Sequence, residues 1–174
     1  MPTADAWRTG AKRFALAADV LNARAQPLQS GMPGGSRDPA VLRAFEEELA
    51  CMFTEITLRA FAVELFLKAR LVRCSVSPPR SHDLSELFRM LPQNKKAILD
   101  RLFDEEFERL FPGSARAGCD SLDALLAESA KAFDEWRYAH EYRPTSAQPG
   151  ALRIAFEILE RRIHDAATAK HEGR

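Results

Sequence analysis

One stretch near the end of the chain holds residue types that could do chemistry together. In EWRYAHEYR, residues 135–143, Arg137 and His140 lie three positions apart. On a helix both side chains would leave the same side, since residues three or four apart are neighbours there. Histidine can take or give a proton near neutral pH, and arginine can hold a phosphate and stabilise the charge that gathers on it. The pair therefore suits cleavage of RNA, and two such pairs could meet across a dimer axis.

Other residues of this stretch share the same helix face or the next one. Glu141 follows Arg137 by four positions, and Tyr138 and Tyr142, also four apart, are the only tyrosines in the chain. An Arg–His pair at this spacing also arises by chance in many helices. Stacking, capping or an ion pair between Arg137 and Glu141 is therefore the structural alternative to catalysis.

Three polar residues earlier in the chain could support a site. Glu64 and Lys68 form an i,i+4 pair in the order that stabilises a helix. If their helix face is buried, Glu64 could instead reach Arg137 and orient it. His82 comes directly before Asp83, so we expect it at the start of a helix. Ligand binding or proton transfer is its alternative role.

No sequence pattern predicts a metal site or a cofactor. The histidines lack the paired spacing of a zinc-binding helix, and Cys51, Cys74 and Cys119 form no C-x-x-C motif. The sequence also contains no P-loop, no dinucleotide-binding glycine run and no G-x-S-x-G motif. We therefore expect a chain that works without a metal and without a cofactor.

The composition is that of a globular protein, with 46% hydrophobic and 29% charged residues. Lysine plus arginine equals aspartate plus glutamate at 25 each, so the net charge is zero. This balance argues against a uniformly basic wrapper for nucleic acid, but it leaves a local basic patch open. No apolar run approaches the roughly 18 residues of a membrane helix. We expect a cytoplasmic protein with no membrane partner.

Apolar residues recur at helical spacing through most of the chain. The clearest helix runs from residue 39 to about residue 74, with one apolar face and phenylalanines beside it. Asp38 is its expected N-cap, and Pro39 takes the first helical position. We expect an earlier helix over about 4–25, followed by a mobile loop at 26–37 that is rich in glycine and proline.

Four more helices are expected in the remainder of the sequence. A short one begins at Asp83, with Glu86 as its capping-box partner. The others cover about 93–111, 121–142 and 151–168. No shift in composition divides the chain, so we predict one domain over 1–174. It should be an all-α, up-and-down bundle of about five or six helices with its core at about 38–168.

Three segments, in this order, resemble the HEPN superfamily of small helical domains. AVELFLKARLV at 62–72 looks like the long helix of the family, with its glutamate and following lysine. SHDLSELFRML at 81–91 resembles the short His-Asp-Leu helix of several branches, and WRYAHEY at 136–142 resembles the C-terminal helix. The resemblance spans about residues 40–165.

This resemblance implies a HEPN-like bundle that forms a homodimer, often in bacterial toxin–antitoxin or antiviral defence systems. Many members are metal-independent endoribonucleases, in which an arginine and a histidine separated by four to six residues meet at the dimer cleft. Here only two residues separate Arg137 from His140, so a variant catalytic pair and a branch without nuclease activity are both open. In some branches a partner nucleotidyltransferase antitoxin modifies a tyrosine two positions after the histidine, which corresponds to Tyr142.

Three functions follow as alternatives. The first is a HEPN-like homodimer that binds a nucleotide, RNA or another protein without catalysis. The second is a metal-independent endoribonuclease toxin that uses Arg137 and His140. The third is a structural helical bundle, in which Arg137, His140 and Tyr142 line no cleft.

Overall fold

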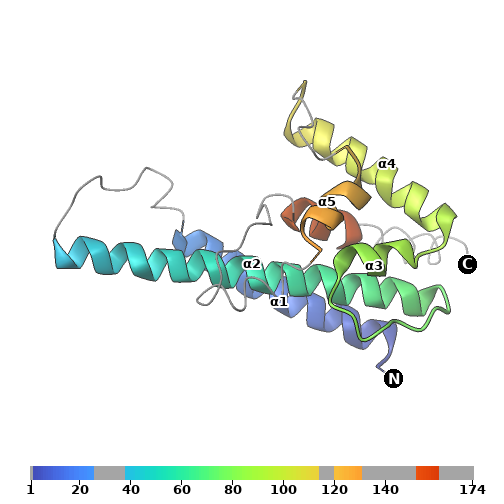
Figure 1. The fold of residues 1–174 in the computed structure, drawn as a ribbon, viewed down its shortest axis with the longest axis horizontal. Coiled ribbons are helices and arrows are strands. Elements are labelled where there is room, and N and C mark those ends of the chain that lie inside the picture. The colour runs from blue at the N-terminus through green and yellow to red at the C-terminus, as the bar shows by residue number, and fades with distance from the viewer. Residues whose placement is uncertain (1, 26–37, 114–119, 131–151, 161–174) are drawn as a thin grey trace, which may run out of the picture.

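A computed structural model of the chain describes residues 2–25, 38–113, 120–130 and 152–160. Within these ranges the chain is all-helical and contains no strand, so the predicted all-α class is confirmed (Figure 1). The helices are α1 (Ala4–Ala25), α2 (Pro39–Arg73), α3 (Leu84–Arg89), α4 (Gln93–Leu110) and α5 (Leu122–Glu128), and residues 152–160 form a further helical segment.

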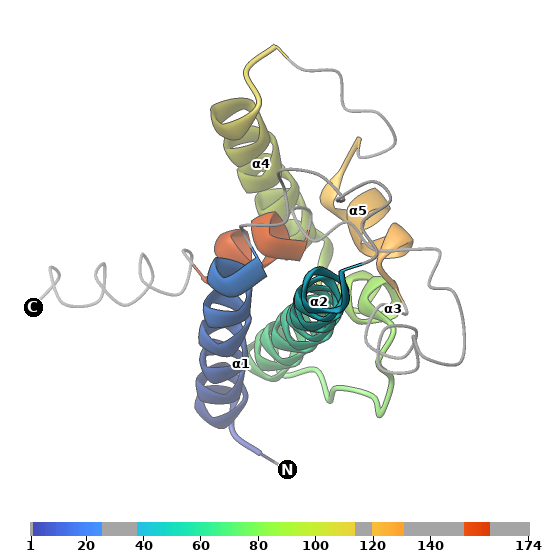
Figure 2. The ribbon, with the colours of Figure 1, turned by 90° about the vertical axis from the view of Figure 1, so that its left-hand side faces the viewer.

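The central element is α2, and the other helices lie around it (Figure 2). Phe66 of α2 is fully buried and meets Phe156 of the 152–160 segment edge to face, with ring centres 5.2 Å apart. Phe88 of α3 and Phe103 of α4 are also buried in the same apolar core. One core therefore joins Phe66 of α2 to side chains that follow it by 22 to 90 residues along the chain.

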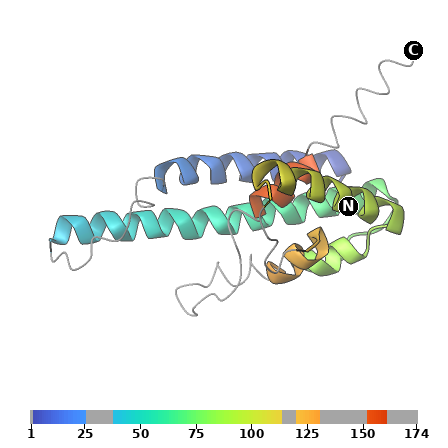
Figure 3. The ribbon, with the colours of Figure 1, turned by 90° about the horizontal axis from the view of Figure 1, so that it is seen from above.

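α1 runs antiparallel to α2 and packs along it (Figure 3). The buried positions of α1 are small residues, Ala11, Ala15 and Ala18. At Gly10 a Cβ atom would lie only 3.2 Å from a methyl carbon of Leu65. The two helices can therefore approach closely at this point, which is what a glycine in a helix interior allows.

The two halves of α2 differ sharply in burial. All of its buried residues lie between Glu55 and Leu71, and none lies in the first sixteen positions of the helix, 39–54. Asp19 of α1 pairs with Arg59, and Asp5 pairs with Arg73. This antiparallel register brings the end of α1 opposite about residue 53, so the first half of α2 extends past it. The predicted apolar face is therefore confirmed as a buried face only in the second half.

Helix starts follow the predicted capping residues. The Asp38 side chain accepts a hydrogen bond from the Ala40 amide at 2.9 Å, with Pro39 in the first turn. The Asp83 side chain accepts from the Glu86 amide at 2.9 Å. The amide of Asp83 itself donates a hydrogen bond to the Ser81 hydroxyl at 3.1 Å. In a capping box, the glutamate side chain would accept this hydrogen bond.

The prediction of one helix over 121–142 was wrong. Ser121 caps α5 as a serine should, since its hydroxyl accepts from the Ala124 amide at 3.1 Å, but the helix ends at Glu128. The carbonyl of Ala130 accepts a hydrogen bond from the Leu84 amide at 3.1 Å instead of continuing the helical pattern. A contact with the start of α3 therefore accompanies the end of α5.

Candidate functional site

The structure places three of the eight predicted site residues. Glu64 and Lys68 lie on α2, and His82 lies just before α3. The other five lie outside the described residues, so their arrangement stays a prediction: Arg137, Tyr138, His140, Glu141 and Tyr142.

Glu64 is the centre of the described part of the site. Its side chain is 1% exposed, and its two oxygens bind two different partners. Oε1 accepts from the Lys68 ammonium at 2.6 Å, which confirms the predicted i,i+4 pair. Oε2 lies 2.8 Å from Nδ1 of His82, a contact that the sequence analysis did not predict. A buried carboxylate is costly unless it is paired and hydrogen-bonded, and here both oxygens are satisfied.

His82 reaches Glu64 from the segment that leads into α3. Ser81 and Asp83, on either side of it, make the hydrogen bonds at the start of that helix. The imidazole of His82 contacts Glu64 of α2, and the His82 side chain is 42% exposed. An ionised carboxylate can only accept hydrogen bonds, so Nδ1 of His82 carries the proton in this contact.

Lys68 is held on its other side by an aromatic ring. Its side chain is 7% exposed, and its Nζ lies 5.7 Å from the ring centre of Trp7 on α1. At this distance the ring attracts the ammonium group. We call Glu64, Lys68, His82 and Trp7 the Glu64 cluster. It joins α1, α2 and the start of α3 through charged contacts inside the bundle.

The chemistry that this cluster offers is concentrated at His82. Lys68 is enclosed, whereas the side chain of His82 is 42% exposed. A carboxylate that fixes one imidazole nitrogen sets the orientation and tautomer of the ring. The predicted reach of Glu64 to Arg137 involves a residue outside the described ranges, and in the described part Glu64 already binds two groups.

A second buried charged group was missed by the sequence analysis. Arg59 on α2 is 1% exposed. Its Nε donates to Glu55 at 2.9 Å, and its Nη2 donates to Asp19 of α1 at 3.0 Å. The i,i+4 spacing of Glu55 and Arg59 is visible in the sequence. Their burial is signalled only by the apolar residues between and beside them, Ile56 and Ala60.

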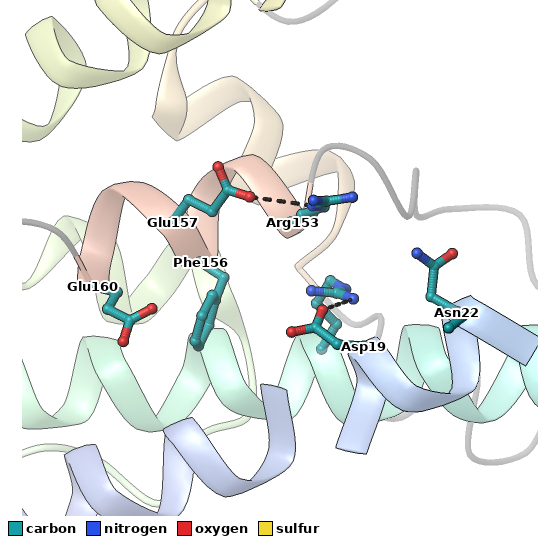
Figure 4. A pocket seen from close by; sticks show the side chains of 8 residues that line it. Asp19, Asn22, Arg153, Phe156, Glu157 and Glu160 are labelled. Carbon is teal, nitrogen blue, oxygen red and sulfur yellow. Dashed lines mark hydrogen bonds and ion pairs between the residues drawn. The ribbon is translucent and has the colours of Figure 1, made fainter. Parts of the chain in front are cut away.

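Arg59 lines a pocket of about 540 Å³ between α1, α2 and the 152–160 segment (Figure 4). Charges on the pocket wall are paired with one another. Arg153 binds Glu157 at 3.2 Å, and Lys12 binds Glu160 at 2.9 Å. Because each of these cations already has a carboxylate partner, the pocket offers no strong attraction to an anion.

No model of a known protein family matches the chain, and no curated protein or solved structure matches it either. Within the described ranges, no group of three or more His, Cys, Asp or Glu side chains is gathered where a metal could bind. None of the described helices has the length and apolar character needed to cross a bilayer.

Proposed function

We propose that this chain is a HEPN-like helical domain that forms a homodimer and binds RNA. The observation that carries the proposal is the 2.8 Å contact between Glu64 and His82. These residues belong to two of the three segments that resemble the superfamily, 62–72 and 81–91. Segments that share a functional role should lie together in space, and these two do so through a partly buried polar contact.

The distribution of charge supports a polyanion as the ligand. The chain as a whole is neutral, but residues 70–96 hold six basic and two acidic side chains. This range covers the end of α2, all of α3 and the start of α4, which lie at one end of the molecule (Figure 1). A cluster of lysine and arginine on one surface is the usual electrostatic signature of a nucleic-acid-binding protein.

The test combines oligomeric state with RNA affinity. Light scattering on the purified chain should give the mass of a dimer, and a fluorescent single-stranded RNA should bind with an affinity that falls steeply with salt. Arg137→Ala should weaken binding, whereas Arg43→Gln, on the exposed first half of α2, should leave it unchanged. A monomer, or a protein that binds no RNA at low salt, would refute the proposal.

A second candidate function is metal-independent cleavage of RNA. The specific observation that favours it is His82, because its imidazole lies 2.8 Å from the Glu64 carboxyl group and its side chain is 42% exposed, and histidine is a common proton-transfer group in catalysis. The predicted pair Arg137 and His140 would supply the phosphate contact and a second proton-transfer group. Purified protein should then cleave RNA in the presence of EDTA, and both His82→Gln and His140→Ala should lower the rate. Intact RNA after long incubation would exclude this function.

The biological setting that we propose is a toxin–antitoxin or antiviral defence system, with a nucleotidyltransferase antitoxin as partner. Tyr142 is the residue that such a partner would modify. Co-expression with a nucleotidyltransferase encoded next to this chain, followed by mass spectrometry, should show a nucleotide added at Tyr142. An unmodified Tyr142 would contradict this part of the proposal and leave RNA binding to be judged separately.

A further inference from the structure

We propose that a pocket between the end of α2 and the first turns of α4 binds a phosphate monoester. The pocket has a volume of about 220 Å³, and we call it the α2–α4 pocket. Its polar wall is formed by three cations, Arg70, Arg73 and Lys95. Among the residues that the structure describes, no carboxylate lines it, in a chain that has as many acidic as basic residues. It therefore differs from the pocket at Arg59, where acidic and basic side chains alternate.

The three cations are held to different degrees. Arg70 is half-buried, and its Nη2 donates to the carbonyl of Leu159 at 3.0 Å, which fixes its guanidinium in the wall. Arg73 is exposed and pairs with Asp5 at 3.2 Å. Asp5 is itself largely exposed, and a surface pair of this kind is weak. Lys95 is exposed at the start of α4. A ligand can therefore engage Arg73 and Lys95 without breaking a buried contact.

The charge of the pocket matches a terminal phosphate. Its wall carries three cations, of which Arg73 pairs with Asp5. A phosphate monoester carries a charge of about −1.5 to −2 at neutral pH, whereas each phosphodiester of an RNA backbone carries about −1. The inference therefore goes beyond the proposed function, because internal phosphates of RNA fit this charge less well than a terminal one.

The remaining wall explains why the ligand should be an ester rather than free phosphate. Leu91 and Leu99 are buried beneath the pocket, and Ile98 lies beside them. A volume of 220 Å³ equals that of about seven water molecules in the liquid. This is more than a phosphate group fills, so the apolar wall can contact the first carbon atoms of the esterified group. Two sources carry this chemistry: a small organic phosphate, such as a mononucleotide, and the phosphorylated end of an RNA strand.

Cys74 gives a direct measure of occupancy, because its partly exposed thiol also lines the pocket. The full chain is alkylated with iodoacetamide, which is uncharged, in the presence of AMP, inorganic phosphate or adenosine. Modification of each cysteine is then followed by mass spectrometry of its peptide. AMP should slow alkylation of Cys74 several-fold, phosphate should do so more weakly, and adenosine should have no effect. Cys51, a partly exposed thiol on the first half of α2, is the internal control and should react at an unchanged rate.

Single substitutions test which cations of the α2–α4 pocket bind the phosphate group. Arg73→Gln and Lys95→Gln should each weaken AMP binding about tenfold, as expected for the loss of one charge-assisted hydrogen bond. Lys96→Gln is the matched control, since this lysine follows Lys95 on α4 but does not line the pocket. Arg70 is left intact because its bond to Leu159 supports the fold. Equal protection by adenosine, equal weakening by Lys96→Gln, or no protection by millimolar AMP, by phosphate and by a 5′-phosphorylated RNA would overturn the proposal.

Two oligonucleotides distinguish the sources of the phosphate. If a 5′-phosphorylated RNA protects Cys74 and its 5′-hydroxyl counterpart does not, the ligand is an RNA end. If AMP protects and neither RNA does, the ligand is a small organic phosphate. AMP protection in a protein that binds no RNA would refute the proposed function and keep this inference, whereas RNA binding in a protein whose Cys74 is protected neither by AMP nor by the 5′-phosphorylated RNA would do the reverse.

Discussion

Replacing Glu64 by glutamine tests whether the Glu64 cluster is as tightly coupled as its geometry indicates. The substitution keeps the shape of the side chain but removes its negative charge. Lys68, whose side chain is only 7% exposed, then keeps a buried ammonium group without a counter-ion. The Nδ1 contact of His82 also loses its charged acceptor. The cluster should therefore lose stability even though no cavity is created.

The expected loss follows from the burial of both partners. Breaking a buried ion pair by removing one charge costs about 3–5 kcal/mol, and the amide oxygen of glutamine still accepts one hydrogen bond. We expect a loss of about 3 kcal/mol, near the lower end. For a chain of this length this corresponds to a fall in Tm of about 6–12 °C. Urea unfolding followed by circular dichroism measures the free energy directly.

The same helix supplies a matched control. Arg43 and Glu47 form an i,i+4 ion pair on α2 whose side chains are 81% and 68% exposed. Glu47→Gln should cost at most a few tenths of a kcal/mol, because surface pairs contribute little. Combining Glu64→Gln with Lys68→Met should recover most of the lost stability, since it removes the stranded charge. If Glu64→Gln costs no more than Glu47→Gln, the reasoning about the buried pair is wrong.

Three further substitutions test other parts of the fold. Burial raises the pKa of Asp100 above 3.8, an effect that the Leu122 amide partly opposes by hydrogen bonding. A raised carboxyl pKa destabilises the fold at neutral pH, so Asp100→Asn should raise Tm at pH 7. The gain should disappear as the pH falls below 3.8, where the carboxyl is protonated in both states; a gain that persists there would argue for another cause. Ser121→Ala removes the N-cap of α5 and should cost about 1 kcal/mol in urea unfolding, and an unchanged midpoint would show that the cap is not needed. Arg59→Gln leaves the buried Glu55 without its cation and should cost about 3 kcal/mol; a double variant with Glu55→Gln that is no more stable would contradict that explanation.

Local signals in the sequence were sufficient to predict most helix boundaries. Asp38 with Pro39, Asp83, and Pro92 mark helix starts through their own backbone and side-chain chemistry, and all three lie at the start of a helix in the structure. The end of α5 carries no such signal. Ser129 is neither glycine nor proline, and the apolar spacing continues past it. The break accompanies a hydrogen bond with the start of α3, and spacing along the chain cannot reveal a contact of that kind.

In the candidate site, too, a contact within one helix was predictable from the sequence, whereas contacts between separate elements were not. The pair Glu64 and Lys68 was predictable because both residues lie one turn apart on a single helix. The contact of Glu64 with His82 spans 18 residues, and that of Arg59 with Asp19 spans 40. Each depends on how two helices come together, so no periodicity encodes it. The pocket between α2 and α4 was equally hidden, because its cations come from separate helices.

The uneven burial along α2 has a consequence for hydrogen exchange. A helix of 35 residues is about 52 Å long, yet only its second half is anchored in the core. Amide protons in the first half should therefore exchange with deuterium through local fraying, at a small free-energy cost. Those between Ile56 and Leu71 should exchange only when the whole domain opens. One continuous helix would then show both weak and strong protection along its length.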